Sequence, residues 1–261
     1  MRVLYVLNMT VSAWRPSVPG IAEAFHARFT DHAYPAHTHD TWTLLIVDDG
    51  AISYDLDRHH HGALGTAVTL LPPNVAHDGR AATSRGFRKR VLYLDADVLG
   101  DDLIGAAVDQ PSLPDPLLRT RIHQLHQSLA EPLEAESRLA MVAQRLRAHL
   151  GRSASAPPDR SLADDLRDLL DERLPDSLTL ADAAEALGTH PVHLVRAFGR
   201  RFGLPPHRYV TGRRVDHARR LLLDGTPPAT VATTAGFTDQ AHLTRHFRRY
   251  LGTTPARFAR G

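Results

Sequence analysis

Hydrophobic positions in the first hundred residues form short alternating or apolar runs, and this pattern predicts β-strands. The runs cover residues 42–47, 51–56, 67–71 and 91–94. Turn-forming clusters separate them, notably Asp48-Asp49-Gly50 and Pro72-Pro73-Asn74. Residues 1–16 are interpreted as a first strand and not as a signal peptide, because no small-residue cleavage site follows. Short strands at this spacing predict a sandwich or barrel over residues 1–100.

From residue 101 the apolar period becomes helical. Two apolar stripes follow it, namely Leu118, Ile122, Leu125 and Leu129, then Leu139, Val142, Leu146 and Leu150. They predict a helical hairpin within residues 101–150 that turns near Glu131-Pro132. Because such stripes would otherwise be exposed, the hairpin is the candidate dimerisation region, and packing onto the barrel is the alternative.

Residues 151–160 are small, polar and proline-bearing, which is typical of a linker. After them the pattern is helical to the end of the chain. The expected fold is therefore α+β with two domains. A β-barrel and a helical hairpin come first, and an all-α domain of tandem helix-turn-helix modules occupies residues 161–261.

A sequence repeat with a spacing of 49 residues lies in this helical half. The first copy contains Leu194, Arg196, Phe198, Arg200, Gly203, Pro206, Arg208 and Tyr209, and the second contains Leu243, Arg245, Phe247, Arg249, Gly252, Pro255, Arg257 and Phe258. In each copy a short helix, a glycine-bearing turn (Gly188, Gly236) and a second helix follow one another. This is the helix-turn-helix arrangement, in which the second helix enters the major groove of DNA.

Between the two modules, residues 206–223 predict a long helix with Val215, Ala218 and Leu222 facing inward. At 1.5 Å per residue such a helix spans roughly 25 Å. This length is comparable to the ~34 Å between successive major-groove faces. One chain could therefore contact two adjacent groove segments.

Charge supports a nucleic-acid partner for the helical half. The chain has a formal net charge of +2, but residues 196–261 contain 13 arginines and only three acidic side chains. Such a concentration attracts a polyanion and makes binding salt-dependent. Zero cysteines exclude disulfides and thiol chemistry and fit a cytoplasmic protein, and no apolar run is long enough for a membrane span.

The helical half resembles the AraC/XylS family of transcription factors. The segment Ala235-Gly236-Phe237-Thr238-Asp239-Gln240, followed by Leu243, Arg245, Phe247, Gly252 and Pro255, carries the resemblance. It implies promoter binding to double-stranded DNA. The implied base-reading positions are Val192, Val195 and Arg196 in the first module and Gln240, His242 and Arg245 in the second. Arg200 and Arg249 are expected to contact phosphates.

The first half resembles the cupin barrels that sense small molecules in regulators of this kind. His37, His39, Gly50, Pro72 and His77 carry this resemblance. The glutamate of the cupin metal site has no counterpart, because Thr43 stands there. The favoured interpretation is therefore a barrel without a metal or other cofactor, in which His37, His39, Trp42 and His77 contact an effector. His37, His39 and His77 are the candidate ligands if a metal is bound, and Trp42 as a core residue is the alternative for that side chain.

The leading hypothesis is a transcriptional regulator that is not an enzyme and that responds to a small-molecule effector. Its expected partners are double-stranded DNA, the effector and a second copy of the chain, with RNA polymerase as a candidate. One alternative is a metal-dependent cupin enzyme fused to a DNA-binding domain. Another is an architectural DNA-binding protein without an effector.

Overall fold

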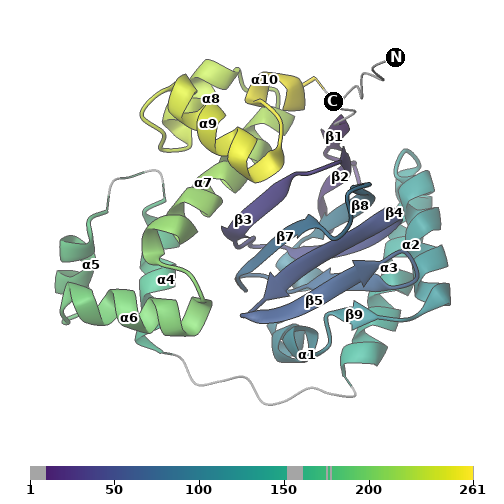
Figure 1. The fold of residues 1–261 in the computed structure, drawn as a ribbon, viewed down its shortest axis with the longest axis horizontal. Coiled ribbons are helices and arrows are strands. Elements are labelled where there is room, and N and C mark those ends of the chain that lie inside the picture. The colour runs from purple at the N-terminus through teal and green to yellow at the C-terminus, as the bar shows by residue number, and fades with distance from the viewer. Residues whose placement is uncertain (1–9, 152–160, 175, 177, 261) are drawn as a thin grey trace.

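The computed structural model describes residues 10–151, 161–174, 176 and 178–260, so most of the expected linker lies outside the described residues. The N-terminal half is built on a sheet of nine strands (Figure 1). They are β1 (Thr10–Trp14), β2 (Ile21–Phe29), β3 (Ala33–His37), β4 (Trp42–Leu56), β5 (His59–Leu64), β6 (Val68–Leu71), β7 (His77–Ala81), β8 (Phe87–Leu94) and β9 (Ser112–Leu113). The expected first strand at residues 1–16 is described only from residue 10, as β1.

Strand β4 connects the two parts of this barrel. Its first part pairs with β8 and β6, and residues 51–56 pair with β5 and β7. The expected turn at Asp48-Asp49-Gly50 is therefore wrong, because the strand continues through a register shift between Val47 and Asp49. Gly50 has a φ of +74°, and a Cβ there would lie 2.1 Å from the carbonyl oxygen of Gly86. A bulge with a left-handed glycine bends a strand without ending it.

The alternation along β4 and β8 separates two cores. Leu45 and Val91 belong to the cluster inside the barrel, whereas Leu44 and Leu92 belong to a second cluster on the outer face. Side chains of a strand point alternately to opposite faces, so neighbouring residues enter different cores. The sheet is buried on both sides, which explains why several of its runs are continuously apolar rather than alternating.

Helices cover the outer face. They are α1 (Ile104–Asp109), α2 (Pro116–Ser128) and α3 (Pro132–Leu150), preceded by the 3-10 turns η1 (Ala96–Val98) and η2 (Asp101–Leu103). The apolar stripes of α2 and α3 are buried in the outer cluster together with Trp42 and Leu44 of the sheet. The hairpin is confirmed, but its stripes pack onto the barrel. The expectation that these stripes would be exposed without a second subunit is therefore wrong, and the alternative, packing onto the barrel, is confirmed.

The C-terminal half contains seven helices within the described residues. They are α4 (Leu162–Glu172), α5 (Leu180–Ala186), α6 (Pro191–Phe202), α7 (Pro206–Leu223), α8 (Pro228–Thr234), α9 (Gln240–Leu251) and α10 (Pro255–Phe258). Figure 1 shows α4–α6 at one end of α7 and α8–α10 at the other. None of the described helices is long and apolar enough to cross a membrane.

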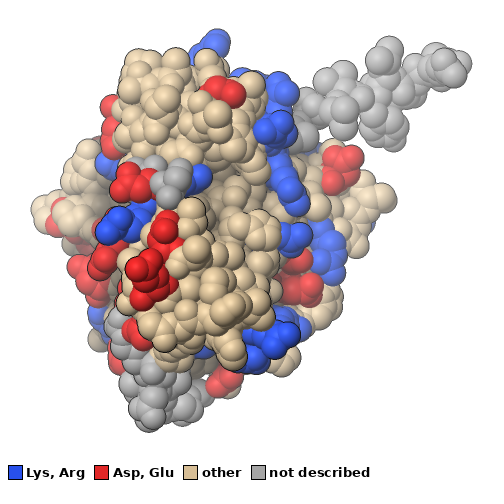
Figure 2. All heavy atoms as spheres, turned by 90° about the vertical axis from the view of Figure 1, so that its left-hand side faces the viewer, with Lys and Arg blue, Asp and Glu red and all other residues tan. Residues whose placement is uncertain are grey.

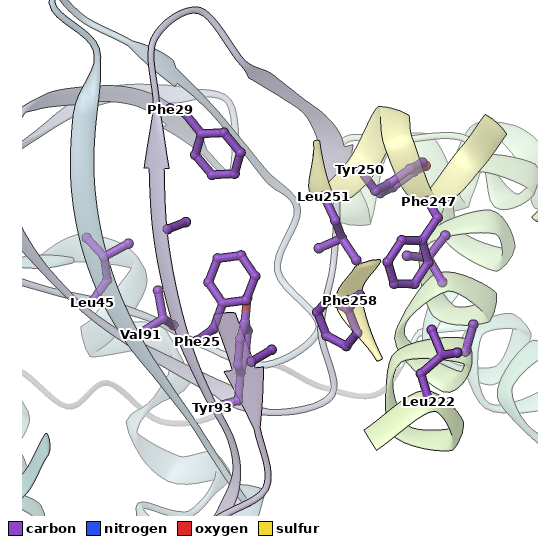
Figure 3. Close-up of a cluster of buried hydrophobic side chains, with 14 of the residues drawn as sticks. Phe25, Phe29, Leu45, Val91, Tyr93, Leu222, Phe247, Tyr250, Leu251 and Phe258 are labelled. Atoms are coloured by element: carbon purple, nitrogen blue, oxygen red, sulfur yellow. The ribbon is translucent and has the colours of Figure 1, made fainter. Parts of the chain in front are cut away.

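The two modules differ in how they join the barrel. The first module has a separate core, which includes Leu166 of α4, Phe198 of α6 and Tyr209 of α7, and Ala76 just before β7 joins it from the barrel. The core of the second module is continuous with the barrel interior, and Figure 3 shows Phe247 and Phe258 on the helical side of a cluster that extends to Phe25. Such a shared core makes the second module and the barrel one packing unit, which the sequence did not indicate.

Burial makes His126 of α2 an acid-sensitive contact between the hairpin and the barrel. Its Nδ1 lies 3.3 Å from Nε2 of His26 in β2. Burial, assisted by His26 and Arg90, lowers the pKa of His126 from 6.5 to about 3. Between these pH values the unfolded chain binds a proton that the folded chain does not, so lowering the pH through this window destabilises the fold. We expect a loss of up to about 1.4 kcal/mol per pH unit from this residue.

Urea unfolding at several pH values between 7 and 4 measures this effect. His126→Gln should make the slope of unfolding free energy against pH shallower. The matched control is His60→Gln, which replaces an exposed histidine. Equal slopes in the wild type and His126→Gln would show that His126 does not carry the effect.

Candidate nucleic-acid interface and barrel cavity

Local signals in the sequence set the ends of the helices in both modules. Helix α5 begins with a capping box, in which Thr179 and Asp182 each accept a hydrogen bond from the other's backbone N–H. Helix α9 begins after Asp239, whose carboxylate accepts a 2.7 Å hydrogen bond from the His242 amide. The turns contain Gly188 (φ +60°) and Gly236 (φ +79°), which adopt the left-handed conformation that glycine tolerates best. The predicted helix-turn-helix modules are thus confirmed.

Apolar positions that recur in the two copies of the repeat are buried. Leu194 and Phe198 of α6 have no exposed surface, and neither do Leu243 and Phe247 of α9. In both helices the buried pair is spaced four residues apart, so one face packs against the rest of its module. The opposite face is left for a partner.

The proposed DNA-contacting positions lie mainly on these outer faces. The exposed ones are Val192, Arg196, Arg200, Gln240, Arg245 and Arg249, while Val195 and His242 are partly buried. None of the four arginines in this set forms a salt bridge with any described residue. Salt bridges to acidic side chains therefore do not occupy Arg196 and Arg245 in this part of the chain. Figure 2 looks at the side of the molecule that carries the first module and shows most of the basic side chains along its right-hand edge, while acidic side chains gather near its middle.

His242 differs from the other proposed readers. Its Nδ1 lies 3.2 Å from the Thr238 hydroxyl, and its ring meets the ring of Phe237 edge-on at 5.4 Å. The imidazole is thus held against the turn of its own module. Its position is fixed before any contact with DNA.

Helix α7 joins the modules and also packs onto the barrel. Tyr209 and Arg213 anchor it to α4, because both donate hydrogen bonds to the Asp171 carboxylate, at 2.7 and 3.0 Å. On the barrel side, Arg213 and Arg220 form salt bridges with Asp40. Gly212 allows the close approach, since a Cβ there would lie 3.4 Å from Cβ of His37.

Part of the arginine excess therefore stabilises the interface between the two halves rather than binding a polyanion. Arg219 is 3% exposed and forms salt bridges with Glu23 of β2 and, at 3.2 Å, with Asp216 of α7. Burial raises the pKa of Glu23, and the charge of Arg219 opposes that rise. Arg219, Asp216 and Glu23 were not predicted from the sequence. For the two residues of α7 the available signal was the i, i+3 spacing of opposite charges on the face that also carries Val215 and Leu222.

A small cavity lies beneath α7. Its volume is about 50 Å³, and residues from both halves of the chain line it. The barrel contributes, among others, Tyr34, His37, His39, Thr43, His77, Lys89 and Tyr93, and the helical half contributes Gly212, Val215, Asp216, Arg219, Tyr250 and Leu251. Three of the four residues expected to contact an effector are thus together at one cavity.

Trp42 does not line this cavity. It is fully buried in the outer cluster, between the sheet and the helices of the hairpin. Successive side chains of a strand point to opposite faces of the sheet. Thr43 and Leu45 point into the cavity, so Trp42 points to the opposite face. The structure therefore places Trp42 with the core, and the sequence-based assignment to the effector site does not hold.

The chain has relatives in both halves. Residues 20–150 match the AraC-like ligand binding domain and residues 183–261 match a helix-turn-helix domain. The transcriptional regulator YbfI of Bacillus subtilis strain 168 is 24% identical over 238 residues, which cover 85% of each chain. The transcriptional activator RhaS of Pectobacterium carotovorum is 22% identical over 263 residues, covering 90% of this chain and 91% of RhaS.

Solved structures show the same fold across both halves. A variant of apo ToxT from Vibrio cholerae aligns over 96% of each chain with a TM-score of 0.66 and 12% identity. ToxT bound to an unsaturated fatty acid aligns over 96% of this chain and 94% of ToxT, also with a TM-score of 0.66, at 11% identity. With its ligand-binding domain, its helix-turn-helix domain and these relatives, the chain belongs to the AraC family of DNA-binding transcriptional regulators.

Proposed function

We propose that this regulator binds a small effector in the barrel cavity and transmits its presence to DNA through α7. The observation that carries this proposal is that α7 both joins the two helix-turn-helix modules and supplies the wall of the cavity at Gly212, Val215, Asp216 and Arg219. A ligand in the cavity would touch the DNA-binding half directly. Such a ligand shifts the arrangement of the two modules if it binds one arrangement of the protein more tightly than another.

The free polar groups of the cavity indicate the chemistry of the effector. The Tyr34 and Thr43 hydroxyls are buried and have no hydrogen-bond partner among the described residues. Lys89 lies in the same lining, with its Nζ 4.2 Å from the centre of the Tyr34 ring. Unpaired buried donors favour a ligand with oxygen acceptors. ToxT has been solved with a fatty acid, but a cavity of about 50 Å³ favours a much smaller oxygen-bearing compound in this protein.

The base-reading positions that we propose are Val192, Val195 and Arg196 on α6 and Gln240, His242 and Arg245 on α9. Arginine can bind guanine through two hydrogen bonds, glutamine can bind adenine, and valine can contact a thymine methyl group. Arg200 and Arg249 are proposed to contact phosphates. The two halves of the operator should differ in sequence, because Val192 and Val195 of one module face bases where Gln240 and His242 do so in the other.

Two arginines of α9 test this division. We expect Arg245→Ala to weaken binding by about 1–3 kcal/mol at particular base pairs, because a base contact is specific. Arg249→Ala should weaken binding to all sequences alike and lower the slope of log affinity against log salt by about 1. Titration of operator variants at several salt concentrations measures both effects.

The matched control is Arg85→Ala, which removes an exposed positive charge from the turn between β7 and β8. It should leave operator binding close to that of the wild type. Loss of affinity with the same sequence profile in Arg245→Ala and Arg249→Ala would contradict the division into base readers and phosphate contacts.

We also infer that the regulator acts as a homodimer in the cytoplasm, where its DNA target lies. Leu117, Leu133 and Met141 of the helical hairpin are 47%, 79% and 46% exposed, and a second copy of the chain would cover this apolar surface. RNA polymerase is a candidate partner if the regulator activates transcription.

The relatives of the chain that are transcriptional regulators favour a barrel that binds an effector over the alternative of a metal-dependent enzyme.

A further inference from the structure

The single lysine of the chain lies inside the barrel. The sequence contains 30 arginines but only one lysine, Lys89. This residue belongs to β8 and shares its inward face with Phe87, Val91 and Tyr93 of the inner cluster, whereas the neighbouring Arg88 is exposed. Lys89 is 9% exposed and lines the cavity beneath α7. The chain thus turns its one side-chain primary amine toward the place where an effector would bind.

Aromatic rings hold this amine in position. Nζ of Lys89 lies 4.2 Å from the centre of the Tyr34 ring and 5.7 Å from that of Phe25. An ammonium group is attracted to the face of such a ring, although a ring carries no negative charge that would neutralise it. Lys89 forms no salt bridge with any residue that the structure describes. The amine is therefore positioned but not paired.

Carboxylates of the cavity lining already have partners. Asp216 accepts a 2.9 Å hydrogen bond from Nδ1 of His39 and forms a salt bridge with Arg219 at 3.2 Å. The other acid of the lining, Asp78, pairs with an arginine at 3.6 Å. Neither of these acids is therefore left to neutralise an ammonium group at Lys89.

A buried lysine without a carboxylate partner favours its neutral form. Burial, together with the positive charge of Arg219, lowers the pKa of Lys89 from 10.5 to about 7. A lysine that is desolvated and lies beside another cation is an activated nucleophile, because its nitrogen lone pair is free. Arginine cannot replace lysine in this role, since the guanidinium group keeps its proton.

We propose that Lys89 binds a small aldehyde covalently, as an imine on its Nζ, and that this adduct is the effector-bound state of the regulator. The inference rests on the proposed function, because it identifies the chemistry of the effector in the same cavity. A volume of about 50 Å³ has room for roughly four water-sized groups, which fits a short-chain aldehyde. The carbonyl oxygen of an aldehyde also supplies the acceptor that the unpaired hydroxyls of the lining require.

Formation of the imine needs no oxidant or reductant. Nζ attacks the carbonyl carbon, a nitrogen–carbon bond forms as the carbon–oxygen double bond opens, and one proton passes from nitrogen to oxygen. The resulting hydroxyl group then leaves as water with the second proton of the nitrogen, and the carbon–nitrogen double bond forms. The Tyr34 hydroxyl is buried and unpaired on the ring beneath Nζ, so it can donate a hydrogen bond to the oxygen during both steps. Hydrolysis reverses the reaction and releases the aldehyde when its concentration falls.

An adduct on β8 is well placed to affect α7. Gly212 and Val215 of α7 line the same cavity as Lys89. Four positions along β8, the ring of Tyr93 lies 4.4 Å from the guanidinium carbon of Arg219, so strand and helix are in contact beside the amine. A group attached to Nζ therefore occupies space that α7 closes.

Reductive trapping of the imine tests the proposal on the full-length chain. The protein is incubated with acetaldehyde and cyanoborohydride at pH 7, with Nα-acetyl-lysine in the same tube as the reference amine, and ethylated peptides are quantified by mass spectrometry. We expect Lys89 to be ethylated at least about 10-fold faster than the reference, because the free amino acid derivative keeps a pKa of about 10.4. Burial without activation would make Lys89 slower than the reference, and that result overturns the proposal.

A second lysine on the other face of β8 provides the matched control. Lys89→Met should lose the rapid ethylation, and Arg88→Lys added to Lys89→Met places the only lysine at a side chain that is 57% exposed. This double variant should be ethylated at about the rate of Nα-acetyl-lysine, with folding checked by circular dichroism. Equal rates for Lys89 in the wild type and for the lysine of the double variant would show that the cavity does not activate the amine.

Tyr34→Phe tests the role of the hydroxyl, because it keeps the ring beneath Nζ. It should slow ethylation of Lys89 by about 10-fold or more. An unchanged rate overturns the role of Tyr34 as the donor.

Thermal unfolding with ethanol or acetate in place of acetaldehyde separates this inference from the proposed function. If these compounds stabilise the wild type and Lys89→Met alike while trapping at Lys89 fails, the cavity binds an effector but the covalent step is overturned. If Lys89 is trapped but operator binding does not respond to acetaldehyde, the covalent site stands and its role as the effector-bound state is overturned.

Discussion

Replacing Arg219 with methionine is expected to separate the DNA-binding half from the barrel. The change leaves Glu23 without its salt-bridge partner and removes one of those of Asp216, although both carboxylates are buried where the two halves meet. Removing one partner of a buried ion pair typically costs about 3–5 kcal/mol. The carboxylates can avoid most of this cost by becoming hydrated, and that requires α7 to leave the barrel. We therefore expect an increased radius of gyration in small-angle X-ray scattering and faster proteolysis between the halves.

Two further variants distinguish charge from packing. Arg220→Met removes the neighbouring arginine of α7, whose side chain is 35% exposed. It should change the free energy of docking of α7 onto the barrel by about 1 kcal/mol or less. Adding Glu23→Gln to Arg219→Met should restore part of the docking, because it removes the carboxylate that is left without a salt-bridge partner. Scattering from Arg219→Met that matches the wild type would show that the ion pairs do not hold the halves together.

The helix-turn-helix modules were predictable from sequence because local residues determine them. Asp239 caps the start of α9, and the repeat positions Leu243 and Phe247 are buried. Helix caps, left-handed glycines and i, i+4 apolar pairs act within a few residues. A single sequence therefore carries most of the information that these helices need.

The cavity was only partly predictable because it depends on contacts between distant segments. His37, His39 and His77 could be singled out as residue types, but their association with Asp216 crosses 177 residues and needs the docked position of α7. The error at Trp42 has a similar origin. When both faces of a strand are buried, its apolar sequence does not indicate which face lines the cavity.

The interface between the halves was missed for a further reason. Arginines of α7 were counted toward a DNA-binding charge, although Arg213 and Arg219 are almost completely buried by the docked barrel. Composition records the charge of a side chain but not its partner. The same residues can serve docking and binding only in different states, so a shift in docking would also change the charge presented to DNA.

Truncating the repeated phenylalanines should reveal how differently the two modules are built. Phe198 and Phe247 occupy equivalent positions and are both fully buried. Either change to alanine should cost about 3–5 kcal/mol, because it leaves a cavity in a close-packed core. For Phe198→Ala we expect the damage to stay within α4–α6, whose core is separate from the barrel interior. For Phe247→Ala we expect it to reach the barrel, because Phe247 shares a cluster with Phe25 and Val91.

Hydrogen exchange followed by mass spectrometry distinguishes these outcomes, and each variant is the control for the other. Peptides from β2 and β8 should exchange faster in Phe247→Ala and at the wild-type rate in Phe198→Ala. Both variants should lose contact with one operator half, since each loses one reading helix. Equal protection of the barrel in the two variants would mean that the second module docks through its charges alone. The shared apolar core would then contribute little, and the coupling between effector and DNA would depend on Arg219, Asp216 and their partners.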